Sequence, residues 1–140
     1  MEGTGERGRT ATLAALLALV LLGQGNLIEA ESFALLARDT TLPEDFDAES
    51  YWRAANGRVL AEKGDLEGAL RLHRDALEFN GRTDEIGIRA DFLCSLAEVA
   101  KRAGRRGEAR EALREAVELY DRKENLVGAA GARERLDALG

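Results

Sequence analysis

Small residues recur through the chain at a fixed spacing. A glycine is followed five residues later by an alanine, and seven residues after that by a second alanine. The three occurrences are Gly25/Ala30/Ala37, Gly64/Ala69/Ala76 and Gly104/Ala109/Ala116. Successive glycines are 39 and then 40 residues apart, and self-similarity at such a period is typical of helical arrays. The pattern therefore predicts a helical hairpin that is repeated along the chain.

The residue types explain why this spacing favours a hairpin. Glycine adopts a positive φ at little cost, so it suits the turn between two antiparallel helices. Another small residue precedes each glycine by seven positions, at Ala18, Gly57 and Ala97. Small side chains on facing helices allow the helix axes to approach to about 8–10 Å. We therefore expect an all-α fold that packs through alanine and glycine.

The spacing resembles that of the tetratricopeptide repeat (TPR) over about residues 11–120. The sequence departs from that family because its repeats are longer than the usual length of about 34 residues and no proline closes each unit. The place of the family's first-helix tryptophan is taken by Ala14, Arg53 and Leu93. The run Thr83–Asn125 also resembles the last full repeat in the C-terminal arrays of bacterial multidomain ATPase transcriptional regulators and adenylate cyclase-like proteins.

The resemblance implies a TPR-like, right-handed alpha-alpha superhelix, a solenoid of about three helical hairpins plus a terminal capping helix. We expect a flexible leader over residues 1–9 and one TPR-like domain over 10–140. Its parts are repeats at about 10–38, 48–79 and 85–120 and a cap at 125–139. The capping helix is polar, as the end of a soluble array has to be.

The first predicted helix, at about 10–22, is apolar nearly all round. Such a helix is usually buried on most sides, so either an upstream repeat or another molecule is expected to cover it. The same run follows Arg7 and Arg9 and has the alternative reading of a secretory signal core. This run of twelve residues, 11–22, is too short to span a bilayer. The register of Ala18 and Gly25 with the later repeats favours a helical repeat.

Composition restricts the function. The net charge is −6, so no general affinity for nucleic acid is expected, and no membrane association is predicted. The single cysteine excludes an intramolecular disulfide and a cysteine metal cluster. We therefore predict a cytoplasmic protein with no metal and no cofactor.

Three stretches could suggest an enzyme. Gly3–Thr10 loosely matches a phosphate-binding loop, but such a loop needs a preceding strand to aim its amides, and only two residues precede it. His73 falls on the predicted inward face of its helix, where a packed side chain is the simpler interpretation. Cys94 would need a base brought close by folding, and His73 is the one histidine. We therefore predict no catalytic residues and no enzyme activity.

By the resemblance, the first helices of successive repeats line a concave groove that holds a protein or peptide partner. The residues that this implies are Tyr51, Arg58, Glu62, Asp91, Glu98, Lys101 and Arg102. Their charges are mixed, and the lysine and asparagine pattern that clamps a chaperone's C-terminal carboxylate is absent. The predicted function is a non-catalytic binding scaffold, the sensing or interaction part of a bacterial signalling or transcription regulator. The alternative is a self-association module that forms a homodimer through residues 11–22.

Overall fold

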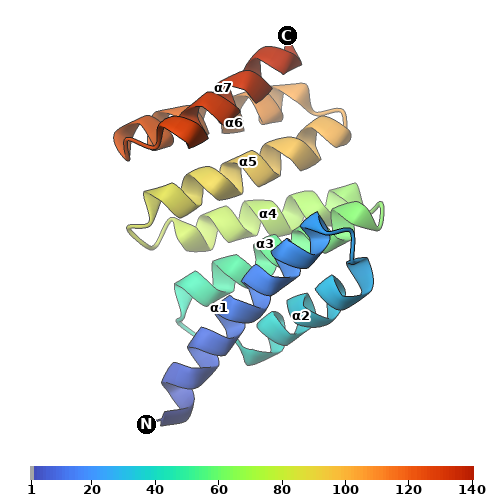
Figure 1. Cartoon of the computed structure of the whole chain (residues 1–140), viewed down its shortest axis with the longest axis vertical. Helices are drawn as coiled ribbons and strands as arrows, with labels where there is room; N and C mark the ends of the chain where they lie inside the picture. Colours follow the sequence, from blue (N-terminus) through green and yellow to red (C-terminus); the bar gives the residue numbers. More distant parts are fainter. Residues whose placement is uncertain (1) are drawn as a thin grey trace. The chain divides into compact units, whose positions relative to one another are not determined.

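A computed structural model of the chain describes the backbone of residues 2–140 and the side chains from residue 9 onward. Over this part of the chain the structure consists of helices, with no strand (Figure 1). The all-α prediction is therefore confirmed. The helices are α1 (Glu2–Gly23), α2 (Leu27–Thr40), α3 (Phe46–Glu62), α4 (Leu66–Asn80), α5 (Ile86–Arg102), α6 (Arg106–Arg122) and α7 (Leu126–Leu139).

The helices form two compact units. The first unit ends at Thr83 and holds α1–α4, and the second, Asp84–Gly140, holds α5–α7. In the first unit, α1 and α2 form an antiparallel hairpin, α3 packs against both of them, and α4 pairs with α3 (Figure 1). In the second unit, α5 and α6 form a hairpin and α7 packs against α6.

The turns inside the three hairpins share one geometry. Gly25, Gly64 and Gly104 have φ of 79°, 92° and 79°, a region that side chains make costly. In each turn the amide of the next residue donates to the carbonyl five positions earlier, as Asn26 N does to Leu21 O at 2.9 Å. This bond satisfies a carbonyl that the end of the helix leaves unpaired. The three glycines therefore occupy the bends between helices, as the repeat predicted.

The alanines of the repeat lie in the core. All six are fully buried, and Ala18 and Ala97 are buried as well. At the corresponding position of the second hairpin, a Cβ on Gly57 would lie 2.5 Å from His73 Nδ1. The small residues therefore serve the close helix approach that their spacing predicted.

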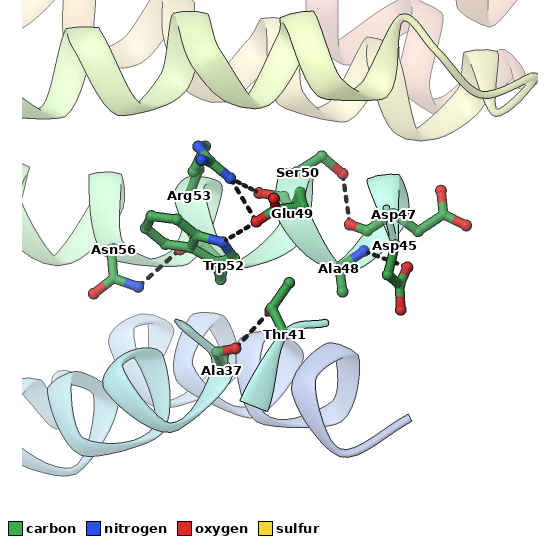
Figure 2. Close-up of polar contacts among 10 residues, drawn as sticks. All are labelled: Ala37, Thr41, Asp45, Asp47, Ala48, Glu49, Ser50, Trp52, Arg53 and Asn56. Atoms are coloured by element: carbon green, nitrogen blue, oxygen red, sulfur yellow. Dashed lines mark hydrogen bonds and ion pairs between the residues drawn. The ribbon is translucent and has the colours of Figure 1, made fainter. Parts of the chain in front are cut away.

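Polar contacts within its first turns fix the start of α3 (Figure 2). Asp45 caps the helix by accepting from Ala48 N at 3.1 Å. Glu49 Oε1 accepts from Trp52 Nε1 at 2.9 Å and from Arg53 at 3.0 Å. Asn56 Nδ2 donates to the backbone carbonyl of Ala34 in α2 at 2.9 Å. The Asn56–Ala34 bond links α3 to α2, whereas the bonds of Asp45 and Glu49 lie within the first turns of α3 and stabilise the start of that helix.

The beginning of α1 differs from the expectation. The helix starts at Glu2 rather than at about residue 10, so the backbone of residues 2–9 is helical where a flexible leader was expected. A helix that has nucleated gains one hydrogen bond for each further residue, and the apolar stretch that follows provides the nucleus. Among the described helices, none combines the length and the apolar character needed to cross a bilayer.

Candidate functional site

Helix α1 places its small residues inward and its large ones outward. Ala11, Ala14, Ala15 and Ala18 are buried against the neighbouring helices. The outward face carries four large apolar side chains with 42–60% of their surface exposed, Leu13, Leu16, Leu17 and Val20. We call these four residues the α1 stripe. A helix that borders solvent normally shows the reverse arrangement.

The packing of α1 against its neighbours explains why its small side chains face inward. Helix α1 packs against both α2 and α3, and alanine lets it approach each of them closely. Leu19 and Leu22 lie at the edge of this contact, partly buried against the core. The residues of the α1 stripe lie outside this contact and stay half-exposed. Helix α2 adds three more exposed apolar side chains, at Ile28, Leu35 and Leu36.

The second unit has a small hollow lined by residues of α5, α6 and α7. Its volume is about 70 Å³, and the residues that line it are Ala97, Glu98, Lys101, Leu113, Arg135, Ala138 and Leu139. Ala97, Leu113 and Leu139 are buried and form an apolar floor. Glu98, Lys101 and Arg135 are exposed at the rim. We call this feature the α5–α7 hollow; its rim holds two cations and one carboxylate on an acidic protein.

A polar cluster beside the hollow ties the helices of the second unit together. Tyr120 of α6 donates a hydrogen bond to Asp91 of α5, and Cys94 Sγ lies 3.9 Å from the Tyr120 hydroxyl. Burial raises the pKa of Cys94, and burial together with the Asp91 hydrogen bond raises the pKa of Tyr120. Both groups therefore stay protonated at neutral pH, and a buried protonated thiol is a poor nucleophile.

His73 is fully buried between α3 and α4, on the inward face that the sequence predicted. Its Nδ1 donates to the Ala69 carbonyl at 2.9 Å. Nε2 is buried without a hydrogen-bond partner among the described residues, as is Nε of Arg58. Burial, helped by the charge of Arg58, lowers the pKa of His73 to about 4 against the opposing effect of the Ala69 bond. The imidazole is therefore neutral at pH 7.

The groove residues predicted from the resemblance fall in both units. In the first, Tyr51 is half-buried against the core of α1 and α2, Arg58 is half-buried, and Glu62 is exposed at the end of α3. In the second, Asp91 bonds Tyr120, and Arg102 is exposed at the end of α5. Glu98 and Lys101 are the two that the structure brings together, at the rim of the α5–α7 hollow.

Arg135 completes the rim, and the prediction from sequence missed it. In the sequence this arginine belongs to a charged cluster, Arg133–Arg135, that was interpreted as the polar surface of a cap. In the structure, the turn that precedes α7 continues the pattern of the hairpin turns. Asn125 N donates to Tyr120 O at 2.9 Å, the same bond as in the three hairpin turns. Continuing the repeat past Gly104 by one more helix would have placed α7 beside α5.

Two other candidate sites carry little chemistry. The segment Gly3–Thr10 belongs to the helical backbone of α1 rather than to a loop, and its side chains up to residue 8 lie outside the described residues. No group of three or more histidine, cysteine, aspartate or glutamate side chains that could hold a metal ion occurs among the residues described.

No protein-family model matches the chain, and no curated protein sequence is detectably similar to it.

Proposed function

We propose that the protein is a non-catalytic helical scaffold of TPR type that binds a protein or peptide partner. The α5–α7 hollow is the observation that carries the proposal. Sites that hold a ligand generally combine an apolar concave floor with a few polar groups that orient it. The hollow has both, and two of its rim residues, Glu98 and Lys101, were expected at a partner-binding surface from sequence.

The rim favours a partner with a particular charge. Lys101 comes from α5 and Arg135 from α7, so an acidic side chain of a peptide could bridge the two helices. Charged groups that are exposed in this way contribute mainly to orientation and to the rate of association. The apolar floor of Ala97, Leu113 and Leu139 would take a small or medium apolar side chain beside the acidic one. The predicted ligand is therefore a short segment with adjacent acidic and apolar residues.

A displayed peptide library tests this proposal. The library is panned against the full chain, and the affinity of each enriched peptide is measured by fluorescence anisotropy. We expect enriched peptides to contain acidic and apolar residues, and Lys101→Glu to weaken their binding at least about tenfold, which is about 1.4 kcal/mol. Arg114→Glu changes the charge equally at an exposed position of α6 outside the hollow and should leave binding unchanged. A library that yields no binder, or binders indifferent to Lys101→Glu, would contradict the proposal.

The wider context follows from the resemblance of Thr83–Asn125 to bacterial regulator arrays. We propose that the hairpins stack as a right-handed superhelix and that the scaffold is the interaction part of a cytoplasmic signalling or transcription regulator. The three hairpin turns with glycine at one geometry support a regular array. Sequencing the reading frame upstream of Met1 tests the context, since an ATPase or cyclase domain there is the expected result.

A further inference from the structure

We propose that the α1 stripe is the contact surface for a second copy of this chain, with the two α1 helices antiparallel. The stripe consists of residues of the first unit and the α5–α7 hollow of residues of the second, so the inference goes beyond the proposed function and does not depend on it.

The geometry of the stripe is that of a helix–helix contact. Leu13, Leu16, Leu17 and Val20 follow the spacing i, i+3, i+4, i+7, which places them on one arc of roughly 100° of the helix. Each keeps between 42% and 60% of its surface in solvent. Monomeric proteins seldom leave large apolar side chains gathered in this way, and such patches mark contact sites. A rotation of α1 about its own axis that buried the stripe would turn the buried alanines out to solvent. The close packing of those alanines therefore excludes it.

Charge favours a second copy as the occupant. No charged residue occurs from Thr10 to Gln24, so the stripe offers nothing for a charged partner to pair with. Two copies that each carry a net charge of −6 repel one another wherever acidic surfaces meet. At the uncharged stripe they can come into contact without placing like charges opposite each other. A copy of the same helix supplies an apolar surface of matching width and length.

The stripe is also symmetric in the way that a two-fold axis requires. In a two-fold interface residue i contacts residue j of the partner and residue j contacts i. Reversing the helix about the point between Leu16 and Leu17 sets Leu16 against Leu17 of the second copy and Leu13 against Val20. The same reversal sets Arg9 beside Gln24, at the C-terminal end of the other α1. A cation is stabilised there because the helix dipole leaves partial negative charge at that end.

The size of the contact predicts a weak dimer. Residues 9–23 of α1 span only about 22 Å, so the buried surface is smaller than the roughly 1,200–2,000 Å² of a standard stable interface. We therefore expect a dissociation constant of roughly 20–100 µM and a dimer that exchanges with monomer in solution.

Sedimentation equilibrium on the full chain at about 5 µM to about 500 µM tests the inference. The natural sequence should pass from monomer to dimer over this range, and Leu16→Lys/Leu17→Lys should raise the dissociation constant at least tenfold. Leu126→Lys/Val127→Lys is the matched control, since it adds the same charge at two adjacent exposed apolar residues of α7, and it should dimerise like the natural sequence. Circular dichroism confirms that both variants fold, as expected for half-exposed positions. A natural chain that stays monomeric throughout, or a control that dissociates as readily as the stripe variant, overturns the inference.

Disulfide trapping tests the antiparallel orientation. Leu13→Cys/Val20→Cys should form a covalent dimer under mild oxidation, because each new cysteine faces the other one in the second copy. The two cysteines of one helix are about 10 Å apart along its axis and cannot bridge within a chain. Leu13→Cys alone should remain monomeric under the same conditions, as should the natural chain with its buried Cys94. A single variant that cross-links as fast as the double one overturns the antiparallel arrangement. Peptide binding at the α5–α7 hollow is measured separately and survives either result.

Discussion

His73 shows how one side chain can use a small residue on the facing helix. Gly57 of α3 leaves the space that the ring occupies, because a Cβ there would lie 2.5 Å from Nδ1. The ring donates from Nδ1 to the Ala69 carbonyl, which fixes the proton on that nitrogen. Burial then disfavours a second proton, and the nearby Arg58 guanidinium disfavours it further. The pKa of about 4 therefore follows from the packing of the ring and from the charge beside it.

The neutral His73 predicts a pH-dependent stability. In the unfolded chain its pKa is about 6.5, so below that pH the unfolded state binds more protons than the folded state does. The free energy of unfolding should therefore fall as the pH decreases from about 6.5 to about 4, by up to about 3 kcal/mol. His73→Leu should remove this part of the pH dependence, because leucine fills a similar volume and does not titrate. Urea unfolding of both proteins at pH 7 and pH 4.5 measures the difference.

The comparison of the two proteins isolates His73. Carboxylates also titrate at low pH, but they do so equally in the natural chain and in the leucine variant. Equal losses of stability in both proteins would show that the imidazole is protonated in the folded state, contrary to its burial. The sequence predicted the inward position of His73 from its place in the repeat. It could not predict the pKa, which depends on Arg58 and Gly57 from another helix.

Among the structural elements, backbone strain is clearest in the turns between helices. The turn between α6 and α7 repeats the bond of the hairpin turns, from Asn125 N to Tyr120 O, but the residue in the glycine position is Glu124, with φ of 56°. Outside glycine and asparagine the left-handed region costs roughly 1–2 kcal/mol. Glu124 is exposed at the tip of the turn, so the cost brings no visible packing benefit.

Replacing this glutamate by glycine should stabilise the protein. We expect Glu124→Gly to raise the free energy of unfolding by about 0.5–1 kcal/mol, less than the whole strain because glycine loses more backbone entropy on folding. Glu124→Ala keeps the strain and should show no such gain. Thermal and chemical unfolding of the three proteins check the prediction. A glycine variant no more stable than the alanine variant would mean that the turn is not strained at this position.

The spacing of small residues also explains which elements could be predicted. Glycine and alanine at fixed intervals determine where helices bend and which faces touch, so the three hairpins and the capping helix follow from sequence. The buried face of α1 was harder to predict, because an apolar helix without a polar face does not indicate which side packs against the core. Its buried face carries the alanines that allow α2 and α3 to pack closely against it. Identifying this face therefore requires the positions of those two helices. Arg135 was missed for a similar reason, since its role depends on the position of α7 beside α5.

At the scale of the whole molecule, the two candidate surfaces differ in charge. The α1 stripe is uncharged, and the α5–α7 hollow has a rim of two cations and one carboxylate on a chain with a net charge of −6. Salt screens interactions between exposed charges over the Debye length, which shortens from about 30 Å at 0.01 M to about 8 Å at 0.15 M. Contact between apolar surfaces does not lose strength in this way. The two surfaces should therefore respond to salt in opposite directions.

We predict that raising the sodium chloride concentration from about 20 mM to about 500 mM strengthens the dimer and weakens peptide binding. The dimer gains because salt screens the repulsion between two acidic copies while the stripes remain in contact. An acidic peptide loses because Lys101 and Arg135 attract it less. Sedimentation equilibrium and fluorescence anisotropy on the same samples measure both constants, and Lys101→Glu should reduce or reverse the salt effect on peptide binding, because it replaces an attracting charge with a repelling one. A dimer that dissociates as salt rises would place its interface on a charged surface and would contradict the assignment to α1.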